Sequence, residues 1–195
     1  MLNMKITILA ASVVLSGMAP TANAADKFLL DTAHTSVLFG LSHLGFSKSF
    51  GRFNTIEGAL TLDAEAPEKS SVVVTIDAAS IDTNNKERDD HLRGKDFFDV
   101  AQFPTLSYKS TSVKLTGEKT ATVTGDLTMH GVTRPVPLEV TLVKTGPHPR
   151  DATKTVAGFS ARGTLKRSDF GMAYGAPVLG DEVELIIEAE TIKQP

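Results

Sequence analysis

Short stretches in which apolar and polar residues alternate run through most of this chain, and they constrain its fold more than any other feature. Between Ser36 and His43, for example, Val37, Phe39 and Leu41 occupy every second position. A period of two is typical of a β-strand with one face in the core and one in solvent. The same alternation predicts strands near residues 54–62, 72–76, 106–108, 123–129, 136–142, 157–165 and 183–189, about eight in all.

The connections between these stretches favour antiparallel pairing. Residues 118–119, 130–135 and 146–154 are polar or carry Pro and Gly, as tight turns do, and residues 44–51 are expected to form a longer loop. The chain has little helix to cover a sheet, so closing the sheet on itself is the way to bury its inner face. We therefore expect an all-β fold, an antiparallel barrel of about eight strands.

One stretch departs from the alternation. Residues 84–100 are densely charged until Phe97 and Phe98, and Pro104 prevents a helix from continuing. We expect one or two short helices here, with Phe97, Phe98 and Phe103 closing one end of the barrel. The charged residues are interpreted as a solvent-exposed helix face, which is more common than an acid–base cluster.

The inward positions could line a ligand cavity. They are mostly apolar, they include the small residues Gly58, Gly125, Ala161, Gly163 and Ala189, and the chain has no Trp to fill the centre. A barrel of this size is either filled by its own side chains or holds one small ligand. Strand parity predicts this lining for an apolar tunnel: Phe39, Leu41, Ile56, Leu60, Val74, Leu106, Tyr108, Val123, Leu127, Leu138, Val140, Phe159, Ala161, Leu185 and Ile187.

The first 24 residues have the pattern of a cleaved signal peptide. Lys5 precedes a short apolar run, residues 6–19, and Ala22-Asn23-Ala24 is the small-residue pattern that signal peptidases accept. The run is too short for a permanent membrane anchor. We expect cleavage after Ala24, a periplasmic location and one domain over residues 25–195.

The composition narrows the choice of function. The chain has no cysteine, which excludes a disulfide, a lipoprotein attachment point and a thiol nucleophile. Its formal net charge of −3 argues against a nucleic-acid partner. No cofactor and no metal site are expected, and the oligomeric state stays open, with a homodimer as one option.

Several motifs, in order along the chain, resemble those of the YceI-like family. They are residues 31–39 (DTAHTSVLF), 43–47 (HLGFS), 51–53 (GRF), 81–83 (IDT), 88–93 (RDDHLR), 96–99 (DFFD), 103–104 (FP), 125–136 (GDLTMHGVTRPV) and 168–172 (SDFGM). The resemblance implies a lipocalin-like antiparallel barrel in the periplasm that holds a polyisoprenoid or similar long-chain lipid. It implies no settled enzymatic activity and supplies no catalytic set.

Two histidines lie near the start of the resemblance. His34 and His43 point to opposite faces of a regular strand, so they cannot bind one metal together. We expect His34 to hydrogen-bond near Asp31. His43 shares the inward parity of Leu41 and could contact a lipid head group at the barrel mouth, or it could be a satisfied rim residue. Arg93 and Arg134 are two further candidates for an anionic head group, with surface ion pairing as the alternative.

Three functions remain open from the sequence. The first is a non-catalytic carrier for a long apolar lipid, whose binding would come from burial of the chain. The second is an enzyme that modifies a lipid within the barrel, although parity offers only His43 as an inward acid or base. The third is a stress-linked scaffold for a membrane redox partner, which nothing in the sequence tests.

Overall fold

The computed structural model describes residues 25–195, so the expected signal peptide lies outside the described residues. The strands are β1 (Asp26–Leu30), β2 (Ser36–His43), β3 (Ser47–Phe53), β4 (Ile56–Leu62), β5 (Ser71–Asp77), β6 (Ile81–Asp82), β7 (Thr105–Leu115), β8 (Thr120–Met129), β9 (Val132–His148), β10 (Asp151–Lys166) and β11 (Leu179–Lys193). One α-helix, α1 (Lys86–Leu92), and three short 3₁₀ helices, η1 (Pro67–Lys69), η2 (Ala78–Ser80) and η3 (Arg167–Phe170), complete the fold. Within this part of the chain, no helix has the length and apolar character needed to cross a membrane.

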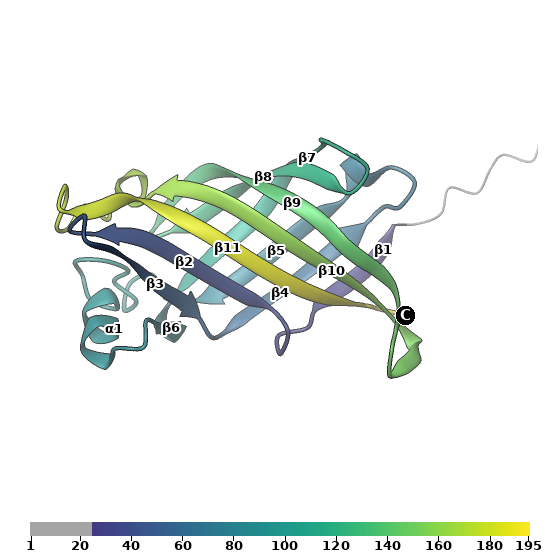
Figure 1. Ribbon diagram of the computed structural model, residues 1–195, viewed down its shortest axis with the longest axis horizontal. Coiled ribbons are helices and arrows are strands. Elements are labelled where there is room, and N and C mark those ends of the chain that lie inside the picture. Colours follow the sequence, from purple (N-terminus) through teal and green to yellow (C-terminus); the bar gives the residue numbers. More distant parts are fainter. Residues whose placement is uncertain (1–24) are drawn as a thin grey trace, which may run out of the picture.

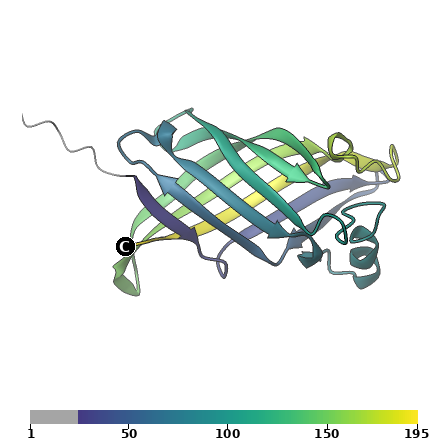
Figure 2. The ribbon, with the colours of Figure 1, turned by 180° about the vertical axis from the view of Figure 1, so that it is seen from behind.

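The strands form a closed antiparallel barrel, as the sequence predicts. Neighbours follow the order β1-β4-β5-β7-β8-β9-β10-β11, and β1 pairs with β11 to close the ring of eight strands. The long strands cross the barrel at a steep tilt (Figures 1 and 2). Closure leaves no free edge along this ring, and it buries the inner face without covering helices.

Three more strands extend the wall at one end. β11 pairs with β1 near its C-terminal end and with β2 over Leu179 to Glu188, and β2 continues the sheet to β3 and β6. The break between β1 and β2 is a turn at Asp31, whose carboxylate accepts the Ala33 N–H at 3.0 Å. The helix α1 lies beside β3 and β6 at this end (Figure 1).

Burial along the strands confirms the predicted parity. On β5, Val72, Val74 and Ile76 are partly buried and the residues between them are exposed. On β8, the buried residues are Val123, Gly125, Leu127 and Met129.

Some predicted connections are wrong. The expected loop at 44–51 contains most of β3. The strand shows no apolar alternation, because its inward positions are Ser49, Gly51 and Phe53 while Phe50 points outward. β1 was not predicted, and the expected link at 146–154 is mostly strand, because β9 and β10 continue into one long hairpin.

Two single residues also depart from the expectation. Asn54 begins the expected strand 54–62 with the parity of Ile56, which predicts an inward side chain, but it is exposed and hydrogen-bonded to Arg52 and Asp82. Pro135, expected in the turn before β9, lies within β9 opposite Asp126. The turn itself is the pair His130 and Gly131, both with positive φ.

Candidate functional site: the apolar interior of the barrel

The wall of the barrel brings the predicted lining residues to its inner face, where they divide into two groups. Ile56, Leu106, Val123, Leu127, Leu138 and Ala161 are buried. The others, Phe39, Leu41, Leu60, Val74, Tyr108, Val140, Phe159, Leu185 and Ile187, are only partly buried.

The partial burial of the second group bears on whether the interior of the barrel is filled. Leu185 and Ile187 lie on β11, which is hydrogen-bonded to β10 on one side and to β2 on the other. Ile187 is paired with the buried Ala161, and both side chains point inward. An inward side chain on a wall that is paired on both sides meets solvent chiefly through the interior. The partial exposure is therefore what an incompletely filled barrel would produce.

Side chains fill the barrel at the level of β1. Phe28, Ala157 and Thr191 are 2%, 0% and 2% exposed. The Thr191 hydroxyl donates to the Ala157 carbonyl at 2.9 Å, so its polar group is satisfied within the core. A ligand inside the barrel would therefore have to lie on the side of this layer that faces α1.

The opposite end carries a plug formed by residues 83–104. Phe98 packs edge-on against Phe53, with ring centroids 5.7 Å apart, and Val100 and Leu92 pack on the same core. Phe103 packs against His130 at the turn before β9. These contacts agree with the expectation for Phe98 and Phe103, whereas Phe97 packs on His91 and Tyr174 beside the core.

Hydrogen bonds tie the first residue of the plug, Thr83, to its helix α1. The buried Asp89 accepts the backbone N–H of Thr83 at 2.8 Å and its hydroxyl at 2.5 Å. Arg88 donates to the same hydroxyl and to the Thr83 carbonyl. A buried carboxylate with this set of partners holds a chain segment in place, which gives the acidic residue a structural role.

Arg93, a head-group candidate from the sequence, belongs to the same network. Its guanidinium donates to the carbonyls of Ala79 and Ile81 and to the carboxylate of Asp90. Its donors are therefore engaged with the protein, which agrees with the structural alternative. The Lys86 ammonium also hydrogen-bonds Asp90 and lowers the pKa of that carboxyl.

The other two head-group candidates are free. His43 and Arg134 are exposed, and neither side chain has a hydrogen bond or an ion pair with another residue in the described range 25–195. His43 ends β2 on the face of Leu41, and Arg134 is paired with the buried, inward Leu127. Both could therefore approach a polar group at the rim of the barrel.

The glycines of the inner face do not leave the room that the sequence suggested. A Cβ atom at Gly125 would lie 2.4 Å from Cζ of Tyr108, and one at Gly58 would lie 2.6 Å from a methyl group of Leu30. These neighbours already occupy the space. The missing side chains allow large residues to lie flat against the wall, so they are not in themselves a sign of a cavity.

Tyr108 is the polar exception within the lining. Its hydroxyl lies 3.0 Å from the carbonyl of Val123 and 3.1 Å from that of Val136. Burial raises the pKa of Tyr108 from 10.0 to about 12. The side chain is therefore a neutral, hydrogen-bonded part of the wall at physiological pH.

His34 hydrogen-bonds Asp31, as predicted, with 2.8 Å between Nδ1 and the carboxylate. This contact lowers the pKa of Asp31 and raises that of His34. Glu190 brings a second carboxylate, and potential ligand atoms of the three residues lie within 4.8 Å of one another. Among residues 25–195, these three come nearest to a set of metal ligands. They lie at the outer surface, and His34 and Asp31 already pair with each other.

A shallow hollow of about 470 Å³ lies on the outer face over β1, β4 and β5. Its floor includes Leu29, Ala59 and Val73, which face each other in register across these strands. None of the fifteen predicted tunnel residues borders it, although the inward Gly58 does.

Sequence reasoning missed Arg167, which is 4% exposed at the start of η3. Its guanidinium donates to the carbonyls of Met172, Leu179 and Gly180, and so it ties residues 172–180 to the end of the barrel. Only the fold brings these carbonyls together, so no local pattern could have identified this role.

Taken together, the geometry defines a closed eight-stranded barrel with an apolar inner face, filled at one level and plugged at the other end. The model of the YceI-like domain matches residues 28–191, and the chain belongs to this family. A UPF0312 protein of Ectopseudomonas mendocina (strain ymp) is 42% identical over 184 residues, 94% of each chain.

Two solved structures are similar in fold. The crystal structure of Burkholderia cenocepacia BcnA matches with a TM-score of 0.75 and 25% identity, over 83% of this chain and 98% of that one. A polyisoprenoid binding domain from Saccharophagus degradans, implicated in plant cell wall breakdown, matches with a TM-score of 0.64 and 16% identity, over 87% of this chain and 99% of that one.

Proposed function

We propose that this protein binds a long-chain isoprenoid or a similar amphiphilic lipid inside its barrel and carries it without changing it chemically. The observation that carries this proposal is the partial exposure of inward apolar side chains such as Leu185 and Ile187 on strands paired on both sides. An apolar chain in that space would remove those surfaces from water, and burial of apolar surface is the main source of affinity for such ligands.

Two further points support the proposal. The related Saccharophagus degradans barrel is described as polyisoprenoid binding, although at 16% identity its likeness to this chain concerns the fold. In addition, Phe28, Ala157 and Thr191 fill the barrel at one level, which would give the lipid chain a defined stop. The polar head would then lie toward the end with His43 and Arg134.

We also propose that the lipid is held in the periplasm. Residues 1–24 have the pattern of a cleaved signal peptide, and the YceI-like domain begins shortly after it, at residue 28. The mature protein would then be one domain that starts at Ala25. Amino-terminal sequencing of the protein from a periplasmic extract tests this, and a mature chain that still contains Lys5 would contradict it.

A chain-length series tests the lipid proposal. Delipidated protein should bind isoprenoid alcohols more tightly as isoprene units are added, until the interior is full, and the ligand should raise the melting temperature because it binds the native state. Affinity that does not depend on chain length would contradict binding inside the barrel.

A head-group experiment extends the same test. Arg134→Ala should weaken a polyprenyl phosphate by about 1.5–3 kcal/mol, and His43→Ala should weaken it by about 0.5–1.5 kcal/mol, with little effect on the free hydrocarbon. Arg162→Ala is the matched control, because Arg162 pairs with Glu188 at 2.6 Å on the outer face. Equal losses for headed and headless ligands would show that these residues shape the barrel and do not contact the head group.

A further inference from the structure

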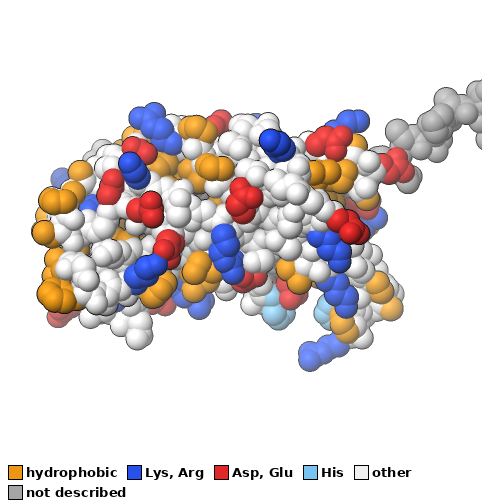
Figure 3. All heavy atoms as spheres, turned by 45° about the horizontal axis from the view of Figure 1, so that its top comes forward, with side chains coloured by type: hydrophobic (Ala, Val, Ile, Leu, Met, Phe, Trp, Pro, Cys, Tyr) orange, Lys and Arg blue, Asp and Glu red, His pale blue; other side chains and the backbone are white. Residues whose placement is uncertain are grey.

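Four apolar side chains project from the end of the barrel that carries the β2–β3 hairpin. Phe46 is 90% exposed, Val178 60%, Tyr174 49% and Leu44 47%. The Leu44 N–H donates to the Val178 carbonyl at 3.1 Å, so the hairpin and residues 174–178 form one surface, here called the apolar tip. Figure 3 shows hydrophobic side chains gathered at this end of the molecule.

The turn of the tip has a backbone conformation that is unfavourable for leucine. Leu44 and Gly45 have φ values of 54° and 75°, and the Phe46 N–H closes the turn on the His43 carbonyl at 3.0 Å. Turns with two positive φ values strongly prefer Asn, Asp or Gly, so a leucine here is strained. Its side chain is also exposed to water. Neither feature stabilises the isolated protein, which points to a role for Leu44 outside it.

On this basis we propose that the apolar tip inserts into the interface of a lipid bilayer and positions the barrel for lipid exchange. The inference deepens the proposed function and rests on it. The tip adjoins the inner face, because Leu41 is a partly buried lining residue. It lies two residues before His43, on the same face of β2. The plug lies at the same end and contacts the tip, with the ring centroids of Phe97 and Tyr174 5.4 Å apart, so a lipid that leaves the bilayer beside the tip would pass the plug to reach the apolar wall.

The size of the tip favours a bilayer over a second protein. Its exposed area is roughly 350–600 Å², taking about 150–250 Å² for each large side chain. A stable protein interface needs about 800 Å² on each partner. A bilayer interface needs no matching surface, and Phe, Leu and Tyr are residues that it accepts readily.

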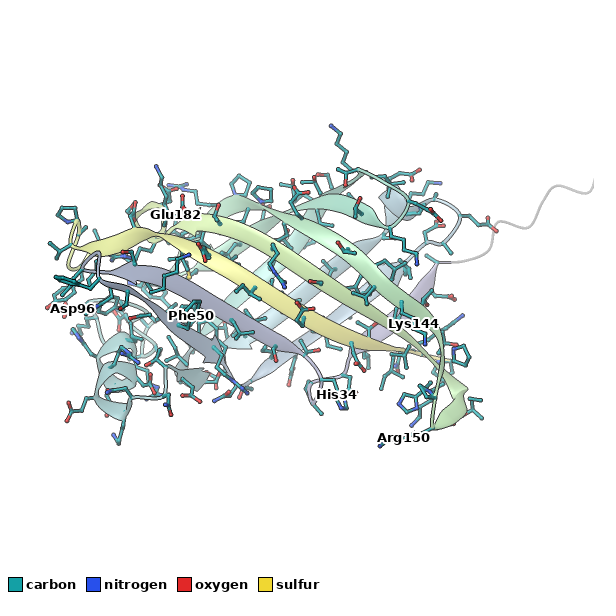
Figure 4. All side chains as sticks on the ribbon, viewed as in Figure 1. His34, Phe50, Asp96, Lys144, Arg150 and Glu182 are labelled. Atoms are coloured by element: carbon teal, nitrogen blue, oxygen red, sulfur yellow. The ribbon has the colours of Figure 1, made fainter. Side chains whose placement is uncertain are left out.

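The charges nearby indicate which membrane surface would suit. Lys48 is ion-paired with Glu184, and Asp96, which Figure 4 places at the same end, lies 3.0 Å from His91. Arg134, unpaired at the same end, is a single charge, so the tip lacks the cluster of positive charges that attracts anionic lipids. We expect insertion that is driven by the apolar side chains and depends little on salt.

Flotation with phosphatidylcholine vesicles tests this proposal. Wild-type protein should float with the vesicles, and the double variant Leu44→Asn/Phe46→Ser should bind at least about tenfold more weakly, because it loses most of the apolar tip. Asparagine tolerates the positive φ of residue 44, so this variant should fold at least as well as the wild type. The matched control is Leu115→Asn/Val143→Ser, which removes side chains 48% and 58% exposed on the strands β7 and β9, away from the tip.

The outcomes separate clearly. Loss of flotation in the tip variant alone, unchanged by added salt or by phosphatidylglycerol, supports the proposal. Equal flotation of the tip and control variants, or no flotation of the wild type, overturns it. A wild-type dimer that the tip variant dissociates in analytical ultracentrifugation also overturns it, because the tip would then be a contact between two copies. Lipid extracted from the same wild-type preparations tests the proposed function separately, since it does not depend on vesicles.

Discussion

Replacing Ala161 by Phe tests whether the barrel has room for a ligand. Ala161 points inward from β10 and is 6% exposed, but its cross-strand neighbours, Val140 and Ile187, are only partly buried. A phenyl ring at this position would enter the space beside those two side chains. Ala157, four residues away on the same strand and face, is 0% exposed and offers no such space.

The sizes of the expected effects follow from this geometry. The added ring takes about the volume of one isoprene unit, and about five carbons at ~0.8 kcal/mol each amount to roughly 3–4 kcal/mol of lost lipid burial. That corresponds to a loss of several hundredfold in affinity. If the space exists, the lipid-free variant should keep its stability within about 1 kcal/mol. In a filled core the same change would cost about 1–3 kcal/mol.

Two measurements on delipidated protein decide the matter: urea unfolding and titration with a long isoprenoid alcohol. Ala161→Phe should bind poorly and unfold like the wild type, whereas the control Ala157→Phe should be clearly destabilised. If Ala161→Phe is destabilised as strongly as Ala157→Phe and still binds lipid normally, the reasoning is refuted.

Three further predictions concern the wall and its outer turn. Gly125→Ala should cost about 1–3 kcal/mol in urea unfolding, because its Cβ would lie 2.4 Å from the Tyr108 ring, while Gly158→Ala, with its nearest atom at 3.9 Å, should stay within about 0.5 kcal/mol. The absorbance at 295 nm that is lost in Tyr108→Phe should titrate near pH 12, because burial raises the pKa of Tyr108 from 10.0 to about 12. The stability that the buried hydroxyl contributes should be full below pH 10 and should be lost as the pH rises through about 12. A titration near pH 10 in folded protein would contradict the buried hydroxyl. The pKa of His34, measured by NMR, should lie above 6.5 and should fall in Asp31→Asn. The stability that the raised pKa of His34 contributes is present below pH 6.5 and lost above it, and the stability from the lowered pKa of Asp31 is lost as the pH falls below 3.8. An unchanged His34 pKa in the variant would exclude the contact.

The inward face of most strands could be predicted from the sequence because burial on one side of a strand imposes a period of two. Val123, Leu127 and Leu138 are examples. The pattern failed at β3, where the inward positions include Ser49 and Gly51, so no apolar alternation reveals the strand.

The candidate site was less accessible to sequence reasoning. The distinction between a filled and an open interior depends on how neighbours pack, as the Tyr108 ring over Gly125 illustrates. The role of Arg93 depends on carbonyls of Ala79 and Ile81 that only the fold brings to it. The exposure of Phe46 likewise depends on where the hairpin ends, and its type alone would have suggested a core residue.

Native mass spectrometry of the protein purified from its own cells, without added lipid or detergent, tests the central claim most directly. The proposal predicts a species heavier than the mature chain by the mass of one long-chain lipid, and organic extraction should release that lipid and leave folded protein. Repeated preparations that contain only the mass of the bare chain, together with a melting temperature that added isoprenoids do not change, would contradict the account.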